Sequence, residues 1–189
     1  MIDYIGDLSR RDAELLREFA QQSDRILEFG VGASTQIFAA YGRGSVDAVD
    51  TEAVWITKTQ QNIAALDVST RPVTFYGYAS FAPVGPYNLI FVDGANEFRL
   101  PFAVLAWPTL AIGGSILLHD TRRREPYGKA KTSDVQHVAA LIERFSAEID
   151  WVVLNQGNSN TTVIRKRAAL VLEDYNKLEG RTPAQLGLE

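Results

Sequence analysis

The sequence predicts an α/β fold with a mostly parallel sheet, and three observations favour it. Short apolar segments alternate with segments whose apolar residues recur at helical spacing. A glycine-containing turn, 30–32, directly follows the first strand-like segment. The last two strand-like segments, 151–154 and 161–164, are joined by six residues, which is too short for a parallel crossover. They must therefore form an antiparallel hairpin at the end of the sheet.

Each element has a local reason. Ser9 followed by Asp12 resembles a capping box and opens the first helix. Short apolar segments read as strands, and segments with apolar residues three or four positions apart read as helices. The expected strands are 25–30, 45–50, 73–76, 87–93, 115–120, 151–154 and 161–164. The expected helices follow Ser9 and then cover 34–41, 55–66, 101–110, 135–149 and 168–178.

One stretch, 100–118, has no charged residue and the length of a membrane-spanning helix. Pro101, Pro108 and the pair Gly113-Gly114 divide it. We expect a helix with Pro101 in its first turn, then a Gly-Gly turn, then a strand buried on both faces. The sequence therefore predicts no membrane association.

Composition narrows the class of protein. The 189 residues are 46% hydrophobic and carry a formal net charge of −4, so no overall basic surface for nucleic acid is expected. The chain has no cysteine, which excludes disulfides, cysteine-ligated metals and thiol nucleophiles. Its start is mixed in charge and lacks the apolar core of a signal peptide, which predicts a cytoplasmic protein.

We expect one domain, 1–167, that includes an N-terminal helix within 1–24, and a C-terminal helical extension, 168–189. The sequence leaves three roles open for the extension: capping the sheet, closing over a site, or making a homodimer contact with a second subunit.

The strongest local signal for a ligand is the turn after the first strand. Glycines at 30 and 32 let a ligand approach the backbone, and the helix that follows offers free N–H groups. Asp50 ends the second strand 20 residues after Gly30, where an acid can accept hydrogen bonds from ribose hydroxyls. Glu28, two residues before Gly30, suits a cationic ammonium or sulfonium and would repel a diphosphate. These residues indicate S-adenosylmethionine.

Four segments together resemble class I S-adenosylmethionine-dependent methyltransferases of the small bacterial, O-methyltransferase-like type. Segment 28–35 resembles their first motif, 50–52 their acidic second motif, 88–94 their fourth, and 110–118 their turn and fifth strand. The resemblance implies a Rossmann-like, doubly wound sheet of seven strands that transfers methyl groups. The cofactor-binding residues that it implies are Glu28, Phe29, Gly30, Val31, Gly32, Ser34, Thr35, Asp50, Thr51, Glu52, Tyr78, Ala79 and Asp93.

The chain departs from this pattern at two positions. Ser34 takes the place of the family's third glycine, and Tyr78 stands where an aspartate often contacts the adenine amine. Two alternatives therefore stay open, a non-catalytic module that binds an adenosyl ligand and an NAD-dependent oxidoreductase.

The class of methyl acceptor is narrowed by what is missing. Asp93-Gly94-Ala95-Asn96 replaces the Asn/Asp-Pro-Pro-Tyr type of motif that accompanies methylation of base amines, and the cysteine needed for carbon-5 pyrimidine methylation is absent. A small-molecule acceptor remains, with a hydroxyl oxygen favoured over nitrogen.

Two acids, Asp93 and Asp120, end neighbouring strands and are expected to face one crevice. Either Asp120 or His119 could remove the hydroxyl proton, although strand alternation predicts that they point to opposite faces. In a second version Asp93 and Asp120 bind Mg²⁺, as in catechol-type O-methyltransferases, although Thr121 replaces the asparagine that those enzymes carry.

Arginines near these acids are candidates for holding the acceptor. Arg122, Arg124 and Tyr127 lie in a basic loop that either clamps a carboxylate or phosphate or is merely solvated. Arg99 belongs to a Phe-Arg pair similar to one in related small bacterial enzymes. The second histidine, His137, is expected on the surface of its helix.

Overall fold

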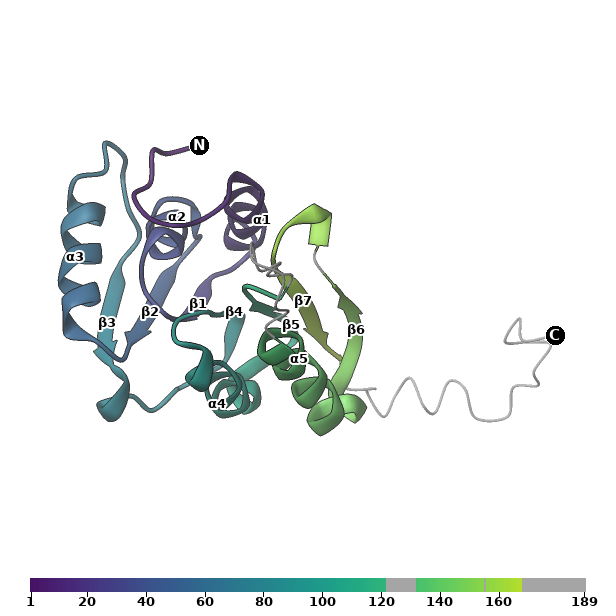
Figure 1. Cartoon of the computed structure of the whole chain (residues 1–189). Coiled ribbons are helices and arrows are strands. Elements are labelled where there is room, and N and C mark those ends of the chain that lie inside the picture. Colours follow the sequence, from purple (N-terminus) through teal and green to yellow (C-terminus); the bar gives the residue numbers. More distant parts are fainter. Residues whose placement is uncertain (122–131, 155, 168–189) are drawn as a thin grey trace, which may run out of the picture.

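The computed structural model describes residues 1–121, 132–154 and 156–167 (Figure 1). Its seven strands form one sheet in the order β3-β2-β1-β4-β5-β7-β6. The pairs from β3 to β5 are parallel, whereas β7 is antiparallel to both β5 and β6. The strands are β1 (Arg25–Phe29), β2 (Ser45–Asp50), β3 (Val73–Gly77), β4 (Tyr87–Val92), β5 (Leu110–Leu118), β6 (Ile149–Val153) and β7 (Thr162–Lys166).

Helices cover both faces of the sheet. They are α1 (Arg10–Ala20), α2 (Ala33–Tyr41), α3 (Ala53–Ala64), α4 (Asn96–Ala106) and α5 (Thr132–Phe145), with short 3₁₀ turns η1 (Tyr78–Ser80), η2 (Trp107–Thr109), η3 (Ser146–Glu148) and η4 (Gln156–Asn158). In Figure 1, α1 to α3 lie on one side of the sheet and α4 with α5 on the other. The architecture is the doubly wound, mostly parallel sheet with a terminal antiparallel hairpin that the sequence predicts.

The two faces of the central strands feed two separate cores because successive strand side chains point to opposite faces. In β1, Leu27 and Phe29 pack with α4 and α5, whereas Ile26 packs with α1 and α2. Both sets of side chains are almost fully buried. The central strands are therefore fixed from both sides, and their carboxyl ends form a rigid edge.

Three sequence-based boundaries are wrong. The Gly113-Gly114 pair is an irregularity inside β5, where the pairing with β4 shifts between Tyr87 and Leu89, and not a turn before the strand. Gly113 supplies the positive φ of +71° that this bulge requires.

Helix α4 begins at Asn96, so Pro101 lies inside the helix and not in its first turn. The start is fixed by Arg99, whose Nε donates to the carbonyl of Gly94 at 3.1 Å. Helix α5 ends at Phe145, and Ile149, expected on its apolar face, instead begins β6.

The uncharged stretch 100–118 is divided between α4, η2 and β5. Within the described ranges, every helix is too short or too polar to cross a bilayer. The expected extension, 168–189, with its helix at 168–178, lies outside the described residues.

Candidate active site

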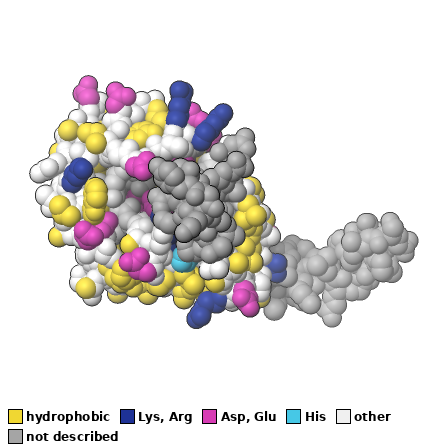
Figure 2. All heavy atoms as spheres, in the orientation of Figure 1, with side chains coloured by type: hydrophobic (Ala, Val, Ile, Leu, Met, Phe, Trp, Pro, Cys, Tyr) yellow, Lys and Arg dark blue, Asp and Glu magenta, His cyan; other side chains and the backbone are white. Residues whose placement is uncertain are grey.

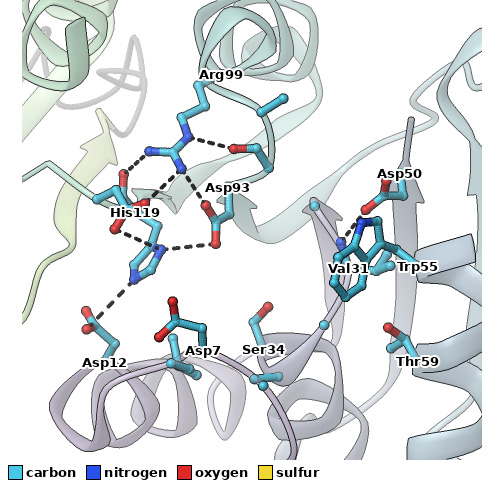
Figure 3. Close-up of a pocket in the computed structure, with 18 of the residues that line it drawn as sticks. Asp7, Asp12, Val31, Ser34, Asp50, Trp55, Thr59, Asp93, Arg99 and His119 are labelled. Atoms are coloured by element: carbon cyan, nitrogen blue, oxygen red, sulfur yellow. Dashed lines mark hydrogen bonds and ion pairs between the residues drawn. The ribbon is translucent and has the colours of Figure 1, made fainter. Parts of the chain in front are cut away.

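A cleft of about 690 Å³ opens at the carboxyl edge of the sheet, where the strand order reverses between β1 and β4. Parallel α/β sheets bind ligands at such a switch point because the loops there diverge to opposite faces. The lining comes from the N-terminal segment before α1, the β1–α2 turn, the β2–α3 region and the ends of β4 and β5. Figure 3 shows that the side chains around it gather at two ends, one near Asp50 and one near Asp93.

The glycine end is built by close backbone packing. Gly30 has φ of +86° and Gly94 has φ of +84°. A Cβ at Gly30 would lie only 2.5 Å from the backbone nitrogen of Gly94. Gly30 therefore has a structural role, because it lets the loops after β1 and β4 touch. At Gly32 a Cβ would meet nothing within 4 Å, so this glycine leaves room beside the cleft.

Asp50 ties this turn to the end of β2. Its carboxylate accepts hydrogen bonds from the backbone N–H of Val31 and of Glu52, both at 2.9 Å. It also lines the cleft. Each carboxylate oxygen can accept a second hydrogen bond, so Asp50 has acceptor capacity left for a ligand.

Glu28, predicted to face the cationic group of the cofactor, is buried in the structure. Its side chain is 0% exposed and lies behind the turn, where Oε1 accepts a hydrogen bond from Ser34. Burial raises the pKa of Glu28 to about 8, and the hydroxyl of Ser34 offsets this only in part. Glu28 is therefore mostly neutral at pH 7, and Ser34, not Glu28, faces the cleft.

Most of the other predicted cofactor residues lie either at the cleft or in the interior. Val31, Gly32, Ser34, Thr51 and Glu52 line the cleft, whereas Phe29 and Thr35 are buried in the protein interior.

Tyr78 packs its ring against Phe98 and Phe102, with centroids 5.7 and 4.8 Å apart, and neither it nor Ala79 is among the residues that line the cleft. An aromatic residue that the sequence analysis missed, Trp55, lies there instead and is 47% exposed.

Arg99 organises the other end of the cleft. Its side chain is 6% exposed. Nη2 lies 2.8 Å from Oδ1 of Asp93 (Figure 3) and 2.9 Å from Oδ2 of Asp120, so one guanidinium nitrogen bridges the two acids. Nη1 donates to the backbone carbonyl of His119 at 3.3 Å. Arg99, predicted as an acceptor-binding residue, is a buried partner of both predicted catalytic acids.

His119 lies between carboxylates on both sides of its ring. Nδ1 is 3.0 Å from Oδ2 of Asp93, and Nε2 is 3.8 Å from Oδ2 of Asp12. Burial alone would lower the pKa of His119, but Asp12, Asp93 and Asp120 outweigh it and raise the pKa to about 10. At neutral pH the ring therefore holds its proton, which is the wrong state for the predicted general base.

His119 and Asp120 both line the cleft, contrary to the prediction from strand alternation. The strand ends at Leu118, and Asp120 has φ of +58°, in the left-handed region. This conformation turns the chain so that the two side chains share one side. Asp is among the residues that tolerate it, and the bonds to Arg99 and Asn160 hold it in place.

Two further members of the cluster were missed by the sequence analysis. Asp12, expected only as part of a helix cap, accepts hydrogen bonds from the Asn160 N–H at 2.9 Å and the Thr161 hydroxyl at 2.7 Å. Burial alone would raise the pKa of Asp12, but His119, Ser9 and Thr161 lower it to about 2. The short Ser9–Asp12 spacing was the available signal, but it indicates only the local cap.

Asn160 donates through Nδ2 to Oδ1 of Asp120 at 2.8 Å. A carboxamide thus lies beside Asp120 although Thr121 replaces the asparagine expected next to it in sequence. The Thr121 hydroxyl lies 2.8 Å from that of Thr162 and is buried.

The groups around Asp93 and Asp120 do not suit the predicted Mg²⁺ site. One ligand atom from each of Asp93, His119 and Asp120 lies within 4.8 Å of the others, a spacing that suits a metal. However, Arg99 places a permanent positive charge between the two acids, and Mg²⁺ prefers an all-oxygen octahedron to a set containing imidazole. The residues present do not fit Mg²⁺.

His137 is not a simple surface residue. With Arg99, His119 and Thr121 it borders a small internal void between α4, β5 and α5, and its Nε2 is buried. Of the predicted acceptor residues, Arg122, Arg124 and Tyr127 lie outside the described residues.

Several solved structures that share this fold are methyltransferases. TomG, an O-methyltransferase from Streptomyces achromogenes involved in tomaymycin synthesis and crystallised with SAM, superposes with a TM-score of 0.65 at 17% identity, covering 87% of this chain and 84% of its own. An O-methyltransferase from Bacillus cereus in complex with SAH gives 0.65 at 18% identity, covering 85% and 83%. A methyltransferase-like protein from Silicibacter pomeroyi gives 0.59 at 14%, covering 98% and 95%.

At these identities the likeness shows the fold alone, which is that of the Rossmann-like methyltransferases. No family model matches the sequence, and no curated protein matches it in sequence. The structural superpositions confirm the predicted fold.

Proposed function

We propose that this chain is an S-adenosylmethionine-dependent methyltransferase that acts on a hydroxyl oxygen of a small molecule. One observation carries the proposal: a single cleft joins the glycine turn with Asp50 to the cluster around Asp93 and Asp120. Its volume of about 690 Å³ falls within the usual range for small-ligand pockets. The methyltransferases of the same fold, two of them crystallised with SAM or SAH, support the choice of ligand.

The glycine end is suited to the nucleoside. Asp50 offers its remaining acceptor positions to ribose hydroxyls, and Gly32 leaves space beside them. The exposed ring of Trp55 is suited to stack against a base. When bound, the cofactor supplies a methyl group on a positively charged sulfur.

The charge of the other end suits that sulfur. Asp12, Asp93 and Asp120 face two cations, Arg99 and protonated His119, so these five described side chains carry one net negative charge. A cationic sulfonium is attracted to such a cluster, whereas a diphosphate is repelled. This charge replaces the role first given to Glu28.

Asp120 is our candidate to take the proton of the acceptor. It lines the cleft, and the hydrogen bonds from Arg99 and Asn160 orient its carboxylate there. The acceptor oxygen forms its bond to the methyl carbon as the carbon–sulfur bond breaks, and its proton passes toward Asp120. Protonated His119 holds Asp93 and does not act as the base.

A second candidate is an adenosyl-binding module without turnover. The observation that favours it is that Arg99 already binds both acids. It predicts adenosyl binding without methyl transfer to any acceptor.

Calorimetric titration with S-adenosylhomocysteine tests the proposal, with NAD as the comparison ligand. We expect binding of S-adenosylhomocysteine and none of NAD. Asp50→Ala should weaken S-adenosylhomocysteine binding about tenfold to a hundredfold, as expected for the loss of hydrogen bonds to a charged group. Asp24→Ala, which removes an exposed acid paired with Arg43, is the matched control and should bind normally.

Tritiated methyl transfer to a panel of hydroxylated small molecules then separates the enzyme from the non-catalytic module. Absence of adenosyl binding to the wild-type protein would contradict both, and preferential NAD binding would support an oxidoreductase.

A further inference from the structure

We propose that the Arg99 guanidinium takes the place of a divalent cation between Asp93 and Asp120, so that methyl transfer at this site needs no metal. The catalytic part of this inference rests on the proposed function; the exclusion of metal from the cluster does not.

The position of Arg99 carries the argument. A cation bridging two carboxylates lies within bonding distance of one oxygen from each, and Nη2 of Arg99 does so at 2.8 and 2.9 Å. Figure 3 shows the guanidinium of Arg99 pointing toward Asp93. Arg99 lies on α4, and the two acids follow the ends of β4 and β5. Its charge cannot be removed by a change of pH in the physiological range.

Further hydrogen bonds hold the Arg99 side chain in this position. Nε donates to the carbonyl of Gly94 and Nη1 to that of His119, so bonds on three nitrogens fix the guanidinium plane. The side chain is 6% exposed and has little room to swing away. The remaining oxygens, Oδ2 of Asp93 and Oδ1 of Asp120, face Nδ1 of His119, so a divalent ion bridging the two acids would have to lie close to the guanidinium charge.

The consequence concerns the acceptor. A divalent ion leaves coordination positions open, and two adjacent oxygens of a substrate can fill them together. A guanidinium already bound to both carboxylates offers no such pair of positions. The site therefore suits an acceptor with an isolated hydroxyl, which Asp120 receives while Arg99 holds Asp120 in place.

The test is a titration of the metal-stripped full chain with Mn²⁺, with free Mn²⁺ followed by its paramagnetic resonance signal. We expect the wild-type cluster to take up no Mn²⁺ at millimolar concentration. Arg99→Met should bind one Mn²⁺ per chain at least about tenfold more tightly than the wild type, because Asp93 and Asp120 lose the guanidinium that neutralises them. Arg99→Lys, which keeps a positive charge, should resemble the wild type, and Arg99→Met combined with Asp120→Asn should lose the new site.

Stoichiometric Mn²⁺ binding to the wild type that Asp120→Asn abolishes would overturn the proposal. So would a folded Arg99→Met protein that takes up no Mn²⁺, because something other than Arg99 would then exclude the metal. If Arg99→Met does not fold, the wild-type titration with Asp120→Asn still decides. Calorimetry with S-adenosylhomocysteine on the same wild-type sample reports on the proposed function independently, since its failure would leave the Mn²⁺ result standing.

Discussion

The two ends of the cleft are fixed by different forces. At the glycine end, backbone atoms touch one another and Asp50 binds two backbone N–H groups. At the other end, ionisable side chains from α1, α4 and the residues after β4 and β5 bind one another. The first end therefore depends on steric fit and the second on charge.

Exposed charged residues differ from this buried charged cluster. Figure 2 shows Lys, Arg, Asp and Glu side chains scattered around the molecule and not gathered in one visible patch. Such exposed pairs contribute little because water screens them. The buried cluster is where charge has structural consequences, and substitutions at the two ends should differ accordingly.

The largest expected effect is steric and lies at the glycine end. Gly30→Ala adds a Cβ that meets the backbone of Gly94 at 2.5 Å in a left-handed conformation. We expect it to lower the free energy of unfolding by about 2–5 kcal/mol, as measured by urea denaturation. Gly32→Ala is the matched control, because it meets nothing and should cost less than about 1 kcal/mol. Equal losses in the two variants would contradict the steric account.

The next effect is a pH dependence at the charged end. The pKa of His119 is raised from 6.5 to about 10, so its contribution is complete below pH 6.5 and is lost as the pH rises through 10. Unfolding free energy should fall at up to about 1.4 kcal/mol per pH unit across this window, by about 2–4 kcal/mol in all. The groups facing the ring are Asp12, Asp93 and Asp120.

His119→Gln should be less stable at pH 7 and should show little of this decline. His137→Gln, which replaces the second histidine, should keep it. A decline of the same size in His119→Gln and in the wild type would assign it to another group.

The same contrast explains which features of the fold and the site could be predicted from the sequence. The glycine turn, Asp50 and the strand–helix alternation depend on neighbours in sequence or on a regular period, so they were predictable. The terminal hairpin followed from the length of one loop. The bulge at Gly113 was not predictable, because it arises from the pairing of β5 with β4.

The charged cluster could be predicted only in part. Strand ends located Asp93 and Asp120, but Asp12 and Asn160 reach the cluster through contacts between positions 148 residues apart. Arg99 was noticed for its motif, yet nothing local shows that it turns inward. Glu28 was predicted as a charged ligand because the sequence does not show that its carboxyl is fully buried.

A second pH effect, over a lower pH window, should come from Glu28, behind the glycine turn. Its pKa is raised from 4.5 to about 8, so its stabilising contribution is complete below pH 4.5 and is lost as the pH rises through 8. Glu28→Gln should remove this decline and raise the unfolding free energy at pH 8 by about 1–2 kcal/mol. Parallel pH profiles for the variant and the wild type would show that Glu28 titrates normally. The windows of Glu28 and His119 overlap only between pH 6.5 and 8, so the two ends can be resolved.

The smallest effect concerns ligand affinity and the choice between two aromatic residues. Trp55 is 47% exposed and lines the cleft, whereas Tyr78 is packed between Phe98 and Phe102. Loss of a stacked aromatic costs about 1–3 kcal/mol per base, and an exposed ring belongs at the low end. Trp55→Ala should therefore weaken S-adenosylhomocysteine binding about fivefold in calorimetry.

The unfolding free energy of Trp55→Ala should change by less than about 0.5 kcal/mol, because the ring is half exposed. Trp151→Ala removes a comparably exposed tryptophan from the edge strand β6 and should leave the affinity unchanged. An unchanged affinity in Trp55→Ala would mean that the base lies elsewhere, and the region of η1 around Tyr78, as first predicted, would then be the next place to test. The outcome thus decides whether the adenine side of the cleft is formed by α3 or by the turn after β3.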